Sequence, residues 1–353
     1  MVVAPVRVLV VDDSALMRHL IADILSADPE IEVVGTARHG LDALGKVESL
    51  GPSVIALDLL MPGMSGLESL RRLMAERPTP VVILTGVRDA RRILEALEQG
   101  AVDFVLKPSG PISPDIGKVG EELIAKVKRA AQVNLWEMLR TLQQGAHSRH
   151  PLGHAAGHIQ HAPIVAVGAS TGGPQALRVV LSGIPRGFGA SVVMVQHIPA
   201  SFTRGFARRI GRLTSLPTKE AEDGEVLEPG VIYVAPGGSH TTVVQEAAGS
   251  IPHVALDHGP PVNGVRPSVD VLFTSLARLD GCPVIGVVLT GMGTDGAEGI
   301  RQLKKAGALT LAQDAPSSAV FGMPRAAAET GAVDYVLPLR EIPAMLVRLV
   351  QGT

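Results

Sequence analysis

Short apolar runs that alternate with helical patterns constrain this chain more than any other feature. Within residues 6–130, the strand-like runs are Val6–Val11, Glu32–Thr36, Val54–Leu57, Val81–Thr85 and Phe104–Leu106. Ser14 precedes the first helical pattern and is a residue type that caps helix N-termini. Buried strands separated by helices are typical of a doubly wound parallel sheet.

The same alternation returns from Pro163 onward. The runs there are Ile164–Val167, Ser191–Gln196, Gly230–Ala235, Val284–Thr290 and Thr310–Ala312. Aromatic residues make up only 3% of the chain, and the apolar content is mainly Val, Leu, Ala and Ile, which suits parallel strands covered by helices. We therefore expect an α/β protein with two doubly wound parallel-sheet domains, the first flavodoxin-like and the second Rossmann-like.

Between these stretches, residues 131–162 have a different character. A helical pattern continues over 133–142, and residues 145–161 then show little apolar periodicity. This segment contains the histidines His147, His150, His154, His158 and His161. They are the type of residue that binds metals, but a solvated, flexible linker explains them better. The predicted domains are thus 1–130 and 163–353, joined by the linker 131–162.

Composition excludes several classes of protein. No run approaches the ~18 consecutive apolar residues of a membrane span, so no membrane insertion is expected. The N-terminus lacks the pattern of a secretory signal. The single cysteine, Cys282, excludes an internal disulfide and fits a reducing cytoplasm. A net charge of −2 without a basic stripe makes nucleic acid an unlikely partner by composition. We expect a cytoplasmic monomer.

Polar residues end the strand-like runs of the first domain. Asp12 and Asp13 follow the first run, Asp58 the third, Thr85 ends the fourth, and Lys107 follows the fifth. The carboxyl ends of parallel strands meet at one edge of a sheet, so these carboxylates would repel one another there unless a hard cation such as Mg²⁺ neutralised them. A carboxylate with a metal and a lysine is an acceptor for phosphoryl transfer.

These residues resemble the response-regulator receiver family over roughly 6–128. The matching motifs are Val-Asp-Asp-Ser at 11–14, Leu-Asp-Leu-Leu-Met-Pro-Gly-Met at 57–64 and Asp-Phe-Val-Leu-Lys-Pro at 103–108. The resemblance implies Asp58 as the phosphorylation site, with Asp13 and Asp58 on Mg²⁺ and Asp12 beside them. It also implies that Thr85 and Lys107 contact the phosphoryl group, that Phe104 is the switching aromatic, and that Pro108 follows a cis peptide bond.

A Gly-x-Ser-x-Gly motif begins the second domain. It places Ser170 between the run Ile164–Val167 and a helical pattern. A phosphate-binding loop and a plain glycine turn are the alternatives. His197 directly follows another run, and Asp295 lies just beyond Val284–Thr290. A nucleophile, a base and an orienting carboxylate would then meet at one sheet edge, as a catalytic triad requires.

The backbone N–H groups near Thr171 and Met292–Gly293 are candidates for an oxyanion hole, each worth about 3 kcal/mol. Which of them serves is left open by the sequence.

The second domain resembles the chemotaxis protein-glutamate methylesterases, the CheB family, and the resemblance extends over about 6–345. Its motifs are Val-Gly-Ala-Ser-Thr-Gly-Gly-Pro at 167–174, Val-Gln-His-Ile-Pro at 195–199, Tyr-Val-Ala-Pro-Gly-Gly at 233–238, Arg-Pro-Ser-Val-Asp-Val-Leu-Phe at 266–273, Leu-Thr-Gly-Met-Gly-Thr-Asp-Gly at 289–296 and Phe-Gly-Met-Pro-Arg at 321–325. It implies Ser170, His197 and Asp295 as the triad, with Thr171 and Met292 lining the site.

The resemblance also implies the substrate and partners. The substrates are γ-methyl-glutamyl esters on chemoreceptors, hydrolysed to glutamate and methanol, and many members deamidate receptor glutamines. The phosphodonor is the histidine kinase CheA, and the esterase needs no cofactor.

Two hypotheses connect the domains. The unphosphorylated receiver covers the serine crevice until phosphorylation of Asp58 loosens it, or the receiver only recruits the enzyme to its receptor. Rival functions are a phospho-switch binding module with an inactive effector, and a serine hydrolase or amidase for another substrate. A transcription factor is disfavoured, because the second domain lacks a helix-turn-helix unit with a basic face.

Overall fold

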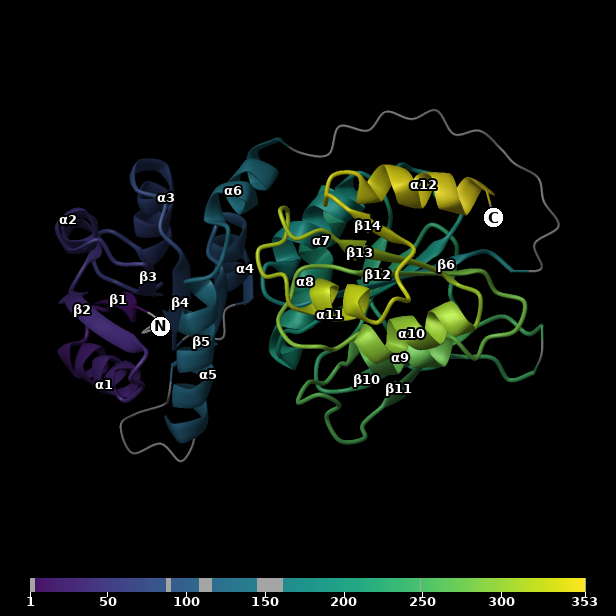
Figure 1. Ribbon diagram of the computed structural model, residues 1–353, viewed down its shortest axis with the longest axis horizontal. Helices are drawn as coiled ribbons and strands as arrows, with labels where there is room; N and C mark the ends of the chain where they lie inside the picture. The colour runs from purple at the N-terminus through teal and green to yellow at the C-terminus, as the bar shows by residue number, and fades with distance from the viewer. Residues whose placement is uncertain (1–3, 87–89, 108–115, 145–160, 248, 353) are drawn as a thin grey trace. The chain divides into compact units, whose positions relative to one another are not determined.

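A computed structural model describes residues 4–86, 90–107, 116–144, 161–247 and 249–352. The chain divides into two compact units, Met1–Leu139 and Arg140–Thr353, and each is described by itself (Figure 1). Among the described residues, no helix has both the length and the apolar character needed to cross a membrane.

The first unit contains a five-stranded, fully parallel sheet in the order β2-β1-β3-β4-β5. The strands are β1 (Val6–Val11), β2 (Ile31–Ala37), β3 (Val54–Asp58), β4 (Val81–Thr85) and β5 (Asp103–Leu106). The helices are α1 (Ala15–Ser26), α2 (Gly40–Leu50), α3 (Gly66–Glu76), α4 (Ala90–Glu98) and α5 (Ile116–Ala130). The order confirms the flavodoxin-like prediction.

Two helical layers cover this sheet. Helix α1 packs beside α5, whereas α2 packs on α3 and α3 on α4. Every residue of β3 and β4 is buried, as expected for central strands covered on both faces. The Ser14 hydroxyl accepts a hydrogen bond from Met17 N at 3.4 Å, which confirms the predicted cap of α1.

The second unit is built on a seven-stranded parallel sheet in the order β14-β13-β12-β6-β7-β9-β8, with a separate antiparallel hairpin, β10-β11. The strands are β6 (Ile164–Ala169), β7 (Ser191–Gln196), β8 (Thr218–Glu220), β9 (Ile232–Val234), β10 (His240–Val244), β11 (His253–Asp257), β12 (Val284–Val288), β13 (Leu309–Gln313) and β14 (Tyr335–Leu337). The helices are α7 (Gly173–Ser182), α8 (Ala200–Leu213), α9 (Val269–Leu276), α10 (Ala297–Lys305), α11 (Met323–Glu329) and α12 (Ile342–Gly352).

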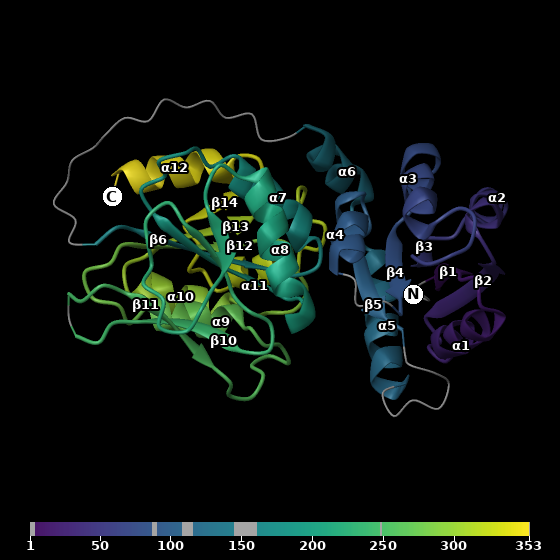
Figure 2. The ribbon, with the colours of Figure 1, turned by 180° about the vertical axis from the view of Figure 1, so that it is seen from behind.

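Strand β6 is the point at which the order of strand addition in this parallel sheet reverses. From β6 it proceeds outward through β7 to the β8–β9 edge, then returns to β12 on the other side and continues to β13 and β14. Helices α9, α10 and α11 form one layer, and α7, α8 and α12 form the other (Figures 1 and 2). In an open α/β sheet the ligand crevice lies at the carboxyl ends of the strands where the order reverses, so β6 and its neighbours position the site.

Several sequence predictions can be compared with these elements. The apolar runs became strands with small shifts at their ends, whereas β8, β10, β11 and β14 were not predicted. The helical pattern predicted over 133–142, inside the linker, is confirmed as helix α6 (Leu135–Gln144). Pro108 and four linker histidines, His147, His150, His154 and His158, lie outside the described residues, so their predictions stay untested.

Candidate active site and phosphorylation site

Strand register places Ser170 beside His197. Ala169 and Gln196 are paired across β6 and β7, so the next residue of each strand leaves the sheet at the same level. His197 N donates to Ala169 O at 3.1 Å, and Gln196 Nε2 donates to Ser170 O at 2.9 Å. One backbone and one side-chain hydrogen bond therefore join the two segments that carry the predicted nucleophile and base.

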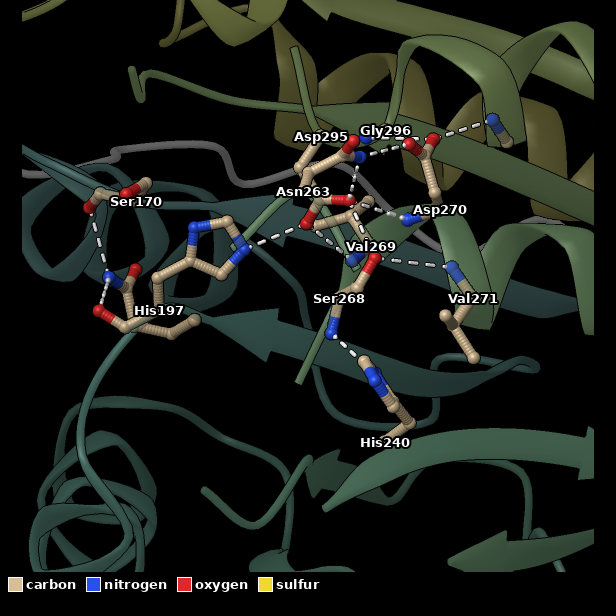
Figure 3. A network of polar contacts seen from close by, with 12 residues as sticks. Ser170, His197, His240, Asn263, Ser268, Val269, Asp270, Val271, Asp295 and Gly296 are labelled. Atoms are coloured by element: carbon tan, nitrogen blue, oxygen red, sulfur yellow. Dashed lines mark hydrogen bonds and ion pairs between the residues drawn. The ribbon is translucent and has the colours of Figure 1, made fainter. Parts of the chain in front are cut away.

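Asp295 approaches from the opposite side of β6. Strand β12 pairs with β6 there, and the loop after β12 carries Asp295 to the start of α10. Asp295 Oδ2 lies 2.8 Å from His197 Nε2, and both side chains are largely buried (Figure 3). The predicted base and carboxylate are therefore brought together as a pair.

The contact with Asp295 determines which nitrogen of His197 remains for Ser170. Because Nε2 faces the carboxylate, Nδ1 is left as the acceptor, and Figure 3 shows Nδ1 on the side of the ring where Ser170 lies. Within the described parts of the chain, no hydrogen bond joins the Ser170 hydroxyl to the imidazole. Such bonds often tighten only when substrate binds.

The N-terminus of α9 holds the Asp295 carboxylate. Oδ1 accepts from Ser268 Oγ at 2.6 Å and from Asp270 N at 3.1 Å, while Oδ2 accepts from Val269 N at 2.7 Å. Burial alone would raise the pKa of Asp295, but the hydrogen bonds from His197, Ser268 and Val269 outweigh it and lower the pKa. The carboxylate is thus kept ionised against the imidazole.

Asp270 makes the reciprocal contact with α10. Its Oδ1 accepts from Gly296 N at 2.9 Å and from Gly299 N at 2.7 Å. A side chain of α9 thus satisfies N–H groups at the N-terminus of α10. Asn263, in the left-handed region at φ 52°, donates to Asp270 Oδ2 at 2.8 Å and to Asp295 Oδ1 at 3.4 Å. Burial and, to a lesser degree, the charge of Asp295 raise the pKa of Asp270.

The candidate oxyanion donors differ in their backbone partners. Ser170 N is already committed, because it donates to Thr290 O at 3.0 Å. Thr171 is buried, and its carbonyl accepts from Thr290 Oγ1 at 3.0 Å. In the part of the chain that the structure describes, the N–H groups of Met292 and Gly293 have no recorded acceptor. They are the donors most open to a ligand at this edge.

The loop after β12 approaches the serine too closely for a side chain at its first position. A Cβ on Gly291 would lie 2.8 Å from Ser170 Cβ and 2.3 Å from Met323 Sδ. Glycine at this position is therefore a steric requirement of the site.

In the first unit, the predicted acidic pocket forms at the carboxyl edge of the sheet. Asp12, Asp13 and Asp58 each offer one oxygen, and these oxygens lie within 4.8 Å of one another. Lys107 Nζ is 2.5 Å from Asp12 Oδ2 and 2.8 Å from Asp58 Oδ2. Burial raises the pKa of Asp58, and Lys107 only partly offsets it. A cluster of carboxylate oxygens of this kind fits Mg²⁺.

The two predicted switch residues lie on the neighbouring strands. Thr85 is buried at the end of β4, and its carbonyl accepts from Lys107 N at 2.9 Å. The Phe104 ring on β5 is also buried, and Lys126 Nζ lies 5.0 Å from its centroid. Lys126 also donates to Phe104 O at 2.6 Å.

Comparison with known proteins decides the family. A family model described as CheB methylesterase matches residues 165–346, and one described as response regulator receiver domain matches residues 8–113. A protein-glutamate methylesterase/protein-glutamine glutaminase from Geobacillus kaustophilus is 48% identical over 98% of this chain and 99% of its own. The chain belongs to the CheB methylesterase family.

Other relatives of this CheB family member agree. The Pyrococcus abyssi protein of the same description is 44% identical, over 98% of this chain and 94% of its own. The crystal structure of the Thermotoga maritima CheB methylesterase catalytic domain is 40% identical and has a TM-score of 0.52, covering 54% of this chain and 99% of that one. The family and fold expectations are thus confirmed, and the receiver match falls within the first compact unit.

Sequence reasoning missed four residues of the CheB-type site: His240, Asn263, Ser268 and Asp270. Signals existed for two of them: the motif at 266–273 contains both Ser268 and Asp270, and Ser268 precedes a short apolar helical pattern as an N-cap does. Nothing in the local sequence indicates that this helix start faces Asp295, which lies in a later loop.

Proposed function

We propose that this chain is a phosphorylation-regulated protein-glutamate methylesterase that hydrolyses γ-methyl-glutamyl esters of chemoreceptors and deamidates receptor glutamines. The observation that carries the proposal is the buried His197–Asp295 pair, 2.8 Å apart, beside Ser170 at the carboxyl edge of the sheet. The relatives' shared description as methylesterase and glutaminase supports the substrate class.

The first half of the reaction forms an acyl-enzyme. Ser170 Oγ attacks the ester carbonyl while His197 Nδ1 accepts the hydroxyl proton, and Asp295 stabilises the resulting imidazolium. When the tetrahedral intermediate collapses, the carbon–oxygen bond to the methoxy group breaks, and the imidazolium returns the proton so that methanol leaves. The N–H groups of Met292 and Gly293, with Thr171 beside them, are proposed to stabilise the oxyanion.

The second half consumes water. His197 Nδ1 accepts a proton from a water molecule, whose oxygen attacks the acyl-serine carbonyl, and collapse returns the proton to Ser170 Oγ. The receptor glutamate is released. A glutamine substrate follows the same course with ammonia as the leaving group.

The acidic pocket would serve as the phosphoryl acceptor. Asp58 would attack the phosphorus of a phosphohistidine on the kinase CheA, with Lys107 and Thr85 contacting the transferred group. Asp12, Asp13 and Asp58 are proposed to hold Mg²⁺, which, when bound, neutralises developing negative charge. We propose that the reaction takes place in the cytoplasm and that the enzyme acts as a monomer.

Regulation would follow from a shift between two receiver states. Phosphorylation of Asp58 would draw Thr85 toward the phosphoryl group and repack Phe104, raising the population in which the serine crevice is open. Turnover by a 163–353 fragment tests this: higher activity than the unphosphorylated full chain supports autoinhibition, and equal activity supports recruitment alone.

The test of function is methanol release from membranes that carry a methylated chemoreceptor, with and without acetyl phosphate and Mg²⁺. Wild type should release methanol, Ser170→Ala should not, and Asp58→Ala should lose the stimulation by acetyl phosphate. A wild-type chain that becomes phosphorylated but is inactive on every methylated receptor would favour the binding-module alternative. Activity that survives Ser170→Ala would reject the proposed nucleophile.

A further inference from the structure

A second buried histidine lies behind the proposed triad. His240 begins β10, and only 2% of its surface is exposed. Its Nδ1 accepts from Ser268 N at 3.2 Å (Figure 3). Its Nε2 lies 3.0 Å from Pro260 O. A backbone N–H can only donate and a carbonyl can only accept, so these partners assign the ring hydrogen to Nε2.

Ser268 connects this histidine to the catalytic carboxylate. Its backbone N–H is held by His240, and its hydroxyl donates to Asp295 Oδ1 at 2.6 Å. The following residue, Val269, donates its N–H to Asp295 Oδ2 at 2.7 Å. A rotation of the backbone at Ser268 would therefore displace one donor from each oxygen of Asp295.

The orientation of Asp295 controls that of His197, because one carboxylate oxygen accepts hydrogen bonds from two donors. Oδ2 accepts from both Val269 N and His197 Nε2, so the direction of the carboxylate sets the direction of the imidazole. The wrong histidine orientation or tautomer is costly in a triad. A displacement of about 1 Å in a catalytic group is enough to reduce turnover by about 10²-fold.

We propose that His240 is a positioning residue for ester hydrolysis. It fixes the backbone of Ser268, and through Ser268 and Val269 it aims the Asp295 carboxylate at His197. The inference rests on the proposed triad and deepens it. Because His240 is buried and acts through Ser268, we expect its effect to fall on kcat rather than on KM.

The alternative is that His240 only fastens the β10-β11 hairpin to the loop that contains Pro260. Two polar variants separate these roles. His240→Asn keeps an acceptor close to the position of Nδ1 and so retains the bond to Ser268 N. His240→Gln reaches the position of Nε2 and so retains the bond to Pro260 O. His240→Leu removes both.

We expect His240→Leu and His240→Gln to lower kcat by up to about 10²-fold, the loss that a misplacement of about 1 Å in a catalytic group produces. His240→Asn should stay within about threefold of wild type, and KM should be unchanged in all three. The matched control is His253→Leu, a partly exposed histidine on β11 that pairs with Val244 at the far end of the same hairpin. It should leave kcat unchanged.

The assay is methanol release by the full chain from membranes carrying a methylated receptor, with Ser170→Ala run in parallel and thermal unfolding measured for each variant. A His240→Asn variant as slow as His240→Gln would overturn the proposal, even if His240→Leu does not fold. So would a wild-type kcat for His240→Gln. If Ser170→Ala remained active, the triad itself would be wrong, which is a separate result.

A double-mutant cycle gives a second test. Because His240 acts through Ser268, His240→Gln should cost less in a Ser268→Ala background than in wild type. Fully multiplicative losses would show that the two residues act independently and would contradict the proposal.

Discussion

Each unit has a buried carboxylate at the carboxyl edge of a parallel sheet, Asp58 in the first and Asp295 in the second, but the pKa values of these two groups are shifted in opposite directions. Asp58 receives the Lys107 ammonium and one backbone N–H, from Leu60 at 3.2 Å, and burial raises its pKa. Asp295 receives His197 and the start of α9, and despite its burial the pKa is lowered.

The difference follows from what each carboxylate has to do. A phosphoryl acceptor must exchange its partners during a reaction, so one side-chain cation and few fixed backbone donors suit the proposed role of Asp58. An orienting carboxylate must not move, so fixed backbone and hydroxyl donors surround it. If the proposed roles are right, the number of fixed donors on these two buried carboxylates separates the phosphoryl acceptor from the orienting group.

The largest effect is expected at Asp295. Asp295→Asn should lower kcat by about 10⁴-fold, because the amide disfavours the tautomer of His197 that accepts the Ser170 proton. Methanol release without a phosphodonor measures it. The control is Asp257→Asn, an exposed carboxylate in the same unit, at the end of β11. A loss below tenfold for Asp295→Asn would mean that this well-held carboxylate is structural.

A smaller effect, on stability, is expected at Asp270. Asp270→Ala removes the acceptor of Gly296 N and Gly299 N at the start of α10. Losing a helix cap should lower the unfolding free energy of the second unit by about 2 kcal/mol. Chemical denaturation of the full chain, followed by a probe in the second unit, measures this change. An unaltered midpoint would show that these N–H groups find other acceptors.

Magnesium should distinguish the two units. A cation that binds only the folded acidic pocket stabilises the first unit by about 1.4 kcal/mol at ten times its Kd. The second unit, whose carboxylates already have fixed donors, should not respond. Unfolding of the two units with increasing Mg²⁺ tests this. Equal stabilisation of both units would contradict the comparison, and loss of the effect in Asp13→Asn would assign the cation to the pocket.

The smallest effect concerns pH. Since the folded-state pKa of Asp58 is raised above its ordinary value of 3.8, its ionisation destabilises the fold above the folded pKa, and the cost vanishes as pH falls below 3.8. Asp58→Asn should therefore raise the melting temperature of the Mg²⁺-free first unit by roughly 4 °C at neutral pH. The gain should shrink in acid. A gain that persisted unchanged at low pH would point to packing instead.

The sequence predicted the central strands well because burial on both faces leaves a continuous apolar run, as in β3, β4 and β12. Strands β8 and β14 were missed because they are three-residue edge strands whose exposure is mixed or intermediate. The β10-β11 hairpin was missed because its strands are only half buried and contain polar residues such as His240 and Thr241.

The residues of the candidate site likewise fall into those that the sequence predicted and those that it did not. Ser170, His197 and Asp295 could be predicted because each follows a strand, and parallel strands bring their ends together. His240 and Ser268 could not, because they come from a hairpin and a helix start whose position depends on packing between elements. The Asn263–Gly264 pair does indicate a left-handed turn, but nothing in the sequence shows that this turn faces Asp270 and Asp295.

Helices α9 and α10 bind each other's carboxylates. Asp270 of α9 accepts hydrogen bonds from the start of α10, and Asp295, next to α10, accepts one from the start of α9. Each negative charge meets the partial positive charge at the N-terminus of the other helix. Withdrawing either helix breaks both contacts at once, because the two caps share the same pair of elements. The carboxylate that we propose for the triad is therefore held by contacts that join two helices, and we expect its alignment to be lost in one step when these helices separate.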